Sequence, residues 1–199
     1  MKKLAAAVIL VLGVMFSSQA QNLNDLSAID AVTGSPKVLG SMVSGKGIVL
    51  IFYSLDCPFA KMYENRIKAV KATFQNQGIA FALIHPETGT GEADQIPLRS
   101  FIDQSGLNMA YLIDAGQAWT KLFQITKIPE VIVLAQGTNG LEIKYRGAID
   151  NNPQAESAVT EKHLERALNQ ILKGEVPTPT QVRAVGCNCL LYTSDAADE

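Results

Sequence analysis

The sequence has no large excess of charge of either sign and few cysteines. Its formal net charge of -2 over 199 residues lacks the basic surplus that a nucleic-acid-binding surface requires. Its 3 cysteines are too few for a disulfide-dependent scaffold. It contains no glycine-rich phosphate loop and no Ser-His-Asp order, and its 2 histidines lack metal-ligand spacing. The remaining composition, 47% hydrophobic, fits one globular domain with short appendages.

The N-terminus lacks an apolar run long enough to cross a bilayer. The stretch 4–16 is about 13 residues long, against the roughly 20 that a spanning helix needs. Lys2 and Lys3 precede it, and Ser18-Gln19-Ala20 follows with small residues suited to cleavage before Gln21. We therefore expect residues 1–20 to be a bacterial signal peptide, and the mature protein to be periplasmic or secreted and free of the membrane. An uncleaved anchor is the alternative.

The other end of the chain has an unusual composition. Residues 189–198 resemble the translation of a sequencing adapter, so we interpret residues 189–199 as a non-native tail; a genuine polar tail is the alternative. Without Cys189, the cysteines Cys57 and Cys187 remain as an even pair. If Cys189 is natural, Cys187-Asn188-Cys189 is a candidate redox or metal pair instead.

The middle of the chain alternates between strand and helix patterns. Residues 21–46 form a lead-in with one edge strand, residues 47–173 a domain, and residues 174–188 a Pro-containing extension. Within the domain, the apolar patterns predict strands at 47–53, 79–84, 110–113, 130–134 and 141–145, and helices at 58–76, 95–105, 117–123 and 160–172. Thr160 is the expected cap of the last helix. This order predicts an α/β fold whose mixed central sheet carries helices on both faces.

Cys57 is the strongest chemical candidate, because it lies where a buried strand meets a long helix. Unpaired N–H groups and the helix dipole favour the thiolate there and lower the pKa of the thiol. Pro58 suits the first helical turn, and Lys61, one turn on, adds positive potential if it folds back. An inert buried thiol is the alternative.

His85 and Pro86 follow the second strand, and we interpret His85 as a strand-end residue rather than a ligand.

Four motifs together resemble the thioredoxin-like superfamily, in particular the secreted redoxins related to alkyl hydroperoxide reductase and thiol-specific antioxidant proteins. They are Phe52-Tyr53-Ser54-Leu55-Asp56-Cys57-Pro58, Ile128-Pro129-Glu130, Tyr145-Arg146-Gly147-Ala148-Ile149-Asp150 and Arg183-Ala184-Val185-Gly186-Cys187. The resemblance runs from about residue 48 to 188, and the segment 84–117 is similar to the insertion that such redoxins carry. It implies that Pro129 is a cis-proline beside the reactive cysteine and that the backbone of Ile128 pairs with extended substrate chains.

The sequence departs from that pattern at the second thioredoxin cysteine, where Ala60 stands. Turnover through a Cys-x-x-Cys pair is therefore not expected here. Ser54 fits the hydroxyl residue that precedes a peroxidatic cysteine, but Leu50 replaces the upstream proline of that motif. Arg146 is a candidate for assisting a thiolate or a peroxide, with a solvated strand-end arginine as the alternative.

The resemblance implies a thiol-dependent oxidoreductase with Cys57 as its nucleophile, acting by thiol–disulfide exchange or peroxide reduction. The even pair of cysteines leads to the hypothesis that Cys187 pairs with Cys57 or resolves it. The expected partners are a protein thiol or disulfide or a peroxide, and an external thiol reductant; no metal or organic cofactor is expected. The rival hypothesis is a redox-inactive binding module on the same fold.

Overall fold

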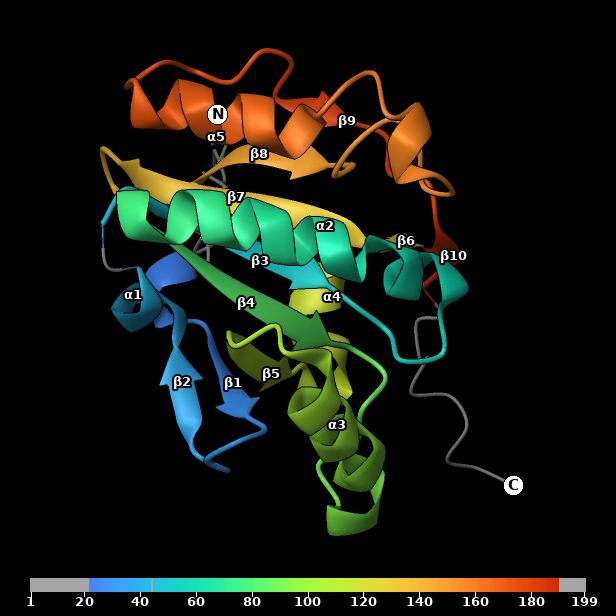
Figure 1. Ribbon diagram of the computed structural model, residues 1–199. Helices are drawn as coiled ribbons and strands as arrows, with labels where there is room; N and C mark the ends of the chain where they lie inside the picture. The colour runs from blue at the N-terminus through green and yellow to red at the C-terminus, as the bar shows by residue number, and fades with distance from the viewer. Residues whose placement is uncertain (1–21, 44, 190–199) are drawn as a thin grey trace, which may run out of the picture.

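The computed structural model describes residues 22–43 and 45–189, and the proposed signal peptide and residues 190–199 lie outside this part of the chain (Figure 1). The main element is an eight-stranded mixed sheet. Its strands, in spatial order, are β2 (Pro36–Val38), β1 (Ser27–Asp30), β5 (Ala110–Ile113), β4 (Ile79–His85), β3 (Gly47–Phe52), β7 (Glu130–Gly137), β8 (Gly140–Gly147) and β9 (Gln181–Val182). Strand β3 is parallel to β4 and antiparallel to β7, so the sheet is mixed as predicted.

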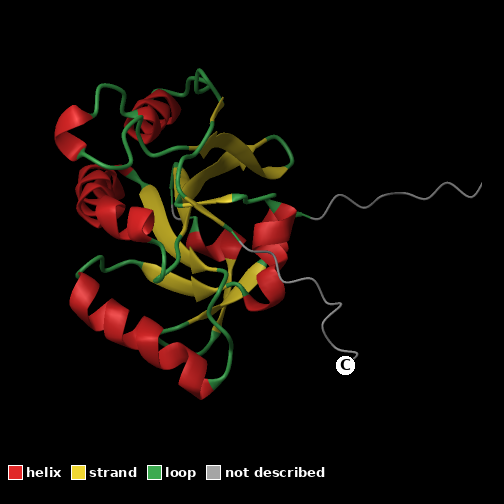
Figure 2. Ribbon diagram, turned by 90° about the vertical axis from the view of Figure 1, so that its right-hand side faces the viewer, coloured by secondary structure: helices red, strands yellow, loops and turns green. Residues whose placement is uncertain are grey.

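Helices cover both faces of this sheet (Figure 2). One face carries α2 (Pro58–Phe74), α3 (Glu92–Ser105) and α5 (His163–Leu172), whereas α1 (Leu39–Met42) and α4 (Ala118–Leu122) pack on the other. All six residues of β3 are buried because alternate side chains enter the two cores. Val49 and Ile51 join the first core, and Ile48 and Leu50 join the second. The predicted alternation of strands and helices is confirmed.

Some boundaries differ from the sequence prediction. Helix α2 ends at Phe74 and continues as a short 3-10 turn to Gln77, before Gly78 reverses the chain with a φ of 87°. Other short 3-10 turns lie at Leu23–Asp25, Ala115–Gln117 and Glu156–Ala158. The lead-in supplies β1 and β2, where the sequence indicated one strand.

Thr160 does not cap α5, contrary to prediction. The helix begins at His163, and Lys162 is its capping residue. Asn151 uses the Thr160 hydroxyl instead, donating to it from Nδ2 at 2.6 Å and accepting the backbone N–H of Thr160 at 3.0 Å. The Thr160 hydroxyl is therefore bonded to the side chain of Asn151 and does not cap the helix.

The C-terminal extension returns to the fold. After α5 the chain pairs with β8 as β9, and then forms a second, two-stranded sheet in which β10 (Cys187–Asn188) lies antiparallel to β6 (Lys127–Ile128). We refer to residues 183–189 as the C-terminal arm. The arm thus reaches the same edge of the molecule as the start of α2, which is visible at the right of Figure 1.

A buried ion pair fixes α2 to the segment that follows β8. Nη1 of Arg66 lies 2.6 Å from Oδ2 of Asp150, and both side chains are less than one tenth exposed. Tyr63 donates its hydroxyl hydrogen to Oδ1 of the same carboxylate at 3.0 Å.

No helix within residues 22–43 and 45–189 has the length and apolarity to cross a membrane.

Candidate active site

Cys57 occupies the N-cap of α2, as the sequence predicted from the strand–helix junction. Its backbone is extended, its side chain makes no capping hydrogen bond, and Pro58 opens the helix. The side chain is buried, with 2% of the residue exposed. Cys57 thus lies at the positive end of the helix dipole, beside the unpaired N–H groups of the first turn, and both favour a negative charge on its sulfur.

Cys57 forms a disulfide with Cys187, across 130 positions of sequence, with the two Cα atoms 5.9 Å apart. The hypothesis that these two cysteines pair is confirmed, whereas the resolving role of Cys187 stays a prediction. Cys187 is half-buried and Cys57 is almost fully buried, so Cys187 is the more exposed of the two residues.

The arm lies on β6 as a short antiparallel strand. Cys187 stands opposite Ile128, the backbone N–H of Cys189 donates to the carbonyl of Thr126 at 3.0 Å, and Nζ of Lys127 donates to Oδ1 of Asn188 at 2.5 Å. Gly186 approaches this strand so closely that a Cβ atom there would lie 2.0 Å from the carbonyl oxygen of Ile128. Only glycine fits that contact without a shift of the arm.

The carbonyl of Ile128 also contacts Cys57. Sγ of Cys57 lies 3.2 Å from this oxygen, and the Ile128–Pro129 peptide bond is cis. A disulfide sulfur carries no hydrogen, so the approach is a van der Waals contact in this state. After reduction, the Cys57 thiol can donate a hydrogen bond to the same oxygen.

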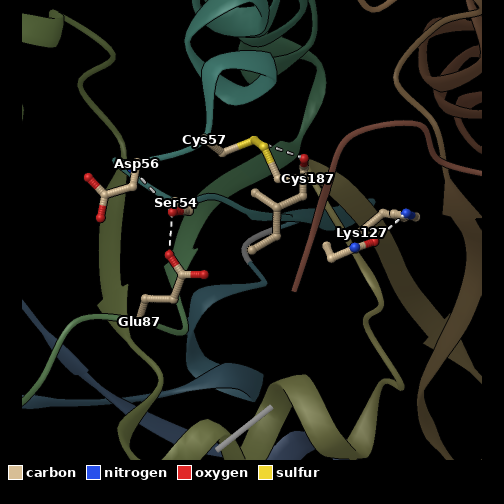
Figure 3. Close-up of a disulfide and its surroundings, with 8 residues drawn as sticks. Ser54, Asp56, Cys57, Glu87, Lys127 and Cys187 are labelled. Carbon is tan, nitrogen blue, oxygen red and sulfur yellow. Dashed lines mark hydrogen bonds between the residues drawn. A yellow bond between two sulfur atoms is a disulfide. The ribbon is translucent and has the colours of Figure 1, made fainter. Parts of the chain in front are cut away.

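Ser54 has partners other than Cys57. Its hydroxyl donates to the carboxylate of Glu87 and accepts the backbone N–H of Asp56 at 3.2 Å. Figure 3 shows this group on one side of the disulfide, with Lys127 on the opposite side. Leu50 is buried in β3, where a peroxidatic motif would have its proline. The hydroxyl of Ser54 is thus engaged by a carboxylate beside the site.

The two candidate cations also have defined positions. The Lys61 side chain is exposed, and its backbone N–H donates to the carbonyl of Cys57 at 3.3 Å. Nη2 of Arg146 lies 3.0 Å from Oε1 of Glu130 and 3.4 Å from the carbonyl of Gln124. Arg146 is therefore neither a solvated strand-end residue nor bonded to Cys57, but part of an ion pair next to Pro129.

His85 ends β4 at a polar pocket of about 360 Å³ that also contains Ser54, Asp56, Glu87 and Asp94. Burial lowers the pKa of His85 to about 3, so the imidazole is neutral at physiological pH. Its Nε2 is buried and finds no hydrogen-bond partner in the described part of the chain. Within that part, no group of three or more His, Cys, Asp or Glu side chains is placed to hold a metal ion.

Cys189, the last residue of the arm, carries a free, half-buried thiol. Burial, followed by the charges of Glu87, Asp114 and Glu130, raises its pKa to about 11. It is therefore protonated at neutral pH and a weak nucleophile, in contrast to the helix-terminal environment of Cys57.

Comparison with known proteins places the chain in a family. The model of the AhpC/TSA family matches residues 20–145. The chain belongs to the AhpC/TSA family. This match covers the strand–helix junction at Cys57 and the pair Ile128–Pro129, but not the arm that carries Cys187. No curated protein matches the chain significantly.

Solved structures agree on the fold of this AhpC/TSA member. A hypothetical protein from Sinorhizobium meliloti 1021 is 23% identical with a TM-score of 0.72, covering 87% of this chain and 93% of its own. An uncharacterized conserved protein from Geobacillus kaustophilus is 21% identical with a TM-score of 0.73, covering 89% and 93%.

A third structure has a functional description. A secreted disulfide oxidoreductase of Mycobacterium tuberculosis, homologous to E. coli DsbE, is 22% identical with a TM-score of 0.51, covering 73% of this chain and 95% of its own. At these identities the likeness shows the fold, and together with the family match it confirms the thioredoxin-like redoxin architecture.

Proposed function

We propose that the protein is a thiol–disulfide oxidoreductase in which Cys57 and Cys187 alternate between dithiol and disulfide. The observation that carries this proposal is the bond itself, which joins a cysteine at a helix N-terminus to a cysteine on a short docked arm. Apart from the bond, the end of this arm is held by its strand pairing with β6, by the Lys127–Asn188 hydrogen bond and by packing of Cys187 and Cys189 against the core. These contacts do not depend on the bond, so the arm can stay docked when the bond opens.

In the reduced protein, the Cys57 thiolate attacks one sulfur of a substrate disulfide. A Cys57–substrate disulfide forms and the other substrate sulfur leaves as a thiolate. The Cys187 thiolate then attacks Sγ of Cys57, which releases the second substrate sulfur and forms the Cys57–Cys187 bond. The substrate disulfide is reduced and the protein pair is oxidised, with no cofactor in the exchange.

An external thiol returns the pair to the dithiol. Because Cys187 is the more exposed residue, the incoming thiolate attacks Sγ of Cys187 and Cys57 leaves as the thiolate. The helix N-terminus stabilises that leaving group, which speeds the exchange. A second external thiolate then attacks the mixed disulfide on Cys187 and releases the oxidised donor.

Disulfide exchange is favoured over peroxide reduction by the polar groups around Cys57. The hydroxyl of Ser54 is bonded to Glu87, and the guanidinium of Arg146 is paired with Glu130. Neither group is hydrogen-bonded to the Cys57 sulfur, where a peroxide would have to be held. Peroxide reduction is therefore the comparison reaction in the test.

The test measures turnover of bis(2-hydroxyethyl) disulfide and of hydrogen peroxide by the full chain, with one thiol donor in both reactions. We expect disulfide turnover that falls at least a hundredfold, roughly the loss of a nucleophile, in Cys57→Ser. Cys189→Ser is the matched control and keeps full activity. If the protein consumes peroxide faster than it reduces the disulfide, peroxide reduction is the preferred reaction. If it does neither, the binding module is favoured.

We also propose that the mature protein acts outside the cytoplasm, because residues 1–20 have the pattern of a signal peptide. A disulfide between Cys57 and Cys187 is compatible with such an oxidising compartment. The test is the intact mass of the protein recovered from a bacterial periplasmic extract. A mature form beginning at Gln21 is expected, and a full-length form in the cytoplasm would contradict it.

A further inference from the structure

A second pocket lies on the arm side of the disulfide. It has a volume of about 320 Å³ and is bounded by residues of β6, β8 and β9 and by the start of the arm. Three cationic side chains line it, Lys127, Arg146 and Arg183, against the single carboxylate of Glu130. The pocket is thus basic in a chain whose formal net charge is -2.

Two of these cations have donors without acceptors. Nε of Arg146 is buried and has no hydrogen-bond partner within residues 22–43 and 45–189, although Nη2 is paired with Glu130. Arg183 is exposed, and its guanidinium makes no hydrogen bond or ion pair with any described residue. The guanidinium of Arg183 is therefore free to pair with an anion in this pocket through charge-assisted hydrogen bonds, with the positive charge of Arg146 beside it.

The pocket is adjacent to the disulfide through Lys127. This residue lines the pocket and also bonds Asn188, the neighbour of Cys187 on the arm. Cys187 stands opposite Ile128 in the antiparallel pair, so the backbone of Lys127 lies within roughly 7 Å of that of Cys187. Arg183 and Ala184, at the start of the arm, also line the pocket, so the pocket lies within three or four residues of Cys187 along the arm.

The charges on the two sides of the disulfide are opposite. Asp56 and Glu87 lie on one side, and Lys127 lies on the other (Figure 3). An anionic group near the disulfide is therefore repelled from the Ser54 side and attracted toward the arm side. The electrostatic field of these side chains therefore orients an incoming anionic thiol so that its charged group lies in the basic pocket.

We propose that this pocket is a subsite for the anionic group, of carboxylate or sulfonate size, of a small thiol that reduces the Cys57–Cys187 disulfide. This inference rests on the proposed function. The bound thiolate attacks Sγ of Cys187, a sulfur–sulfur bond forms between them, and the Cys57 thiolate leaves. A second thiol molecule attacks the mixed disulfide, giving the oxidised small thiol and the Cys187 thiolate.

The test compares three thiols with one two-carbon frame and different charge: 2-mercaptoethanesulfonate, 2-mercaptoethanol and cysteamine. Each rate of reduction of the oxidised full chain is divided by the rate with bis(2-hydroxyethyl) disulfide under the same conditions, which removes differences in thiolate reactivity. We expect the anionic thiol to exceed the neutral one by about three- to tenfold at low ionic strength, and this preference to shrink as salt is added.

Arg183 supplies the decisive variants because its side chain has no structural contact to lose. Arg183→Gln should lower the preference for the anionic thiol, and Arg183→Glu, which leaves two cations against two carboxylates, should bring it close to one. Lys173→Gln, an exposed cation after α5, is the matched control and should leave the preference unchanged. Ethanesulfonate, which lacks a thiol, should slow the anionic thiol in a saturable way.

Three results overturn the subsite. If all three thiols reduce the disulfide with no preference, or the preference persists in Arg183→Glu, the pocket does not select the donor and the proposed function is unaffected. If none of the thiols reduces the disulfide of the folded protein, both the subsite and the proposed oxidoreductase are wrong.

Discussion

Opening the Cys57–Cys187 disulfide should lower the stability of the fold without unfolding it. The bond closes a loop of 130 residues. In the chain-entropy account, a loop of this length stabilises the folded state by about 5 kcal/mol, which is comparable to the whole stability of many domains. The value is an upper estimate, because a compact unfolded ensemble has less entropy to lose.

The chain offers a direct probe of this effect. Its single tryptophan, Trp119, is buried in the core between α4 and the sheet, so its fluorescence reports global unfolding. With a urea slope of about 2 kcal/mol per molar, the midpoint should fall by up to about 2.5 M on reduction. Cys57→Ser combined with Cys187→Ser should reproduce the reduced midpoint, and Cys189→Ser should not move it.

The reasoning is refuted by either of two results. A loss of less than about 1 kcal/mol on reduction would mean that closing this loop does not restrict the unfolded chain as the chain-entropy account requires. Complete unfolding of the reduced protein in buffer would mean that the fold requires the disulfide. In that case the pair could not cycle, because the dithiol would have no folded site.

Three other predictions use different contacts. Asp150→Ala leaves the Arg66 guanidinium buried without its counter-ion and should cost about 3–5 kcal/mol in the same urea assay, with recovery when Arg66→Met is added. Gly186→Ala places a methyl group against the Ile128 carbonyl, so in a glutathione redox buffer the dithiol should be favoured about tenfold more than in the wild type. His85 has a pKa of about 3 in the fold, below its unfolded value of about 6.5, so protons bind preferentially to the unfolded chain between these values. Stability should therefore fall by about 2 kcal/mol from pH 6.5 to pH 5, and His85→Phe should remove this slope in urea titrations at each pH.

Local signals in the sequence predict the position of Cys57 correctly. A continuous apolar run followed by Cys-Pro and a helical period defines a strand, a helix N-terminus and the residue between them. These features depend on residues close in sequence, so they can be interpreted without the rest of the chain. The same holds for the layers of the fold, because alternation of strands and helices restricts the sheet to a few topologies.

The surroundings of Cys57 depend on contacts between distant residues. Strand β10 has only two residues, which is too short to show an alternating pattern in the sequence. Its pairing with β6 could therefore not be predicted. Ser54 fits a peroxidatic pattern by spacing alone, yet Glu87, on a loop 33 positions away, takes its hydroxyl. Pairs of this kind depend on where loops meet in space. Gly186 was a usable signal, because glycine before a cysteine permits a close backbone approach.

Capture of a mixed disulfide on Cys57 is the most direct test of the proposed exchange reaction. The measurement uses reduced Cys187→Ser protein, one equivalent of bis(2-hydroxyethyl) disulfide, and peptide mass mapping after acid quenching. The account predicts one hydroxyethyl adduct, located on Cys57, that persists because no resolving thiol is present. An adduct on Cys189, or an unmodified Cys57 in folded protein that reacts only after denaturation, would contradict the role of Cys57 as the nucleophile.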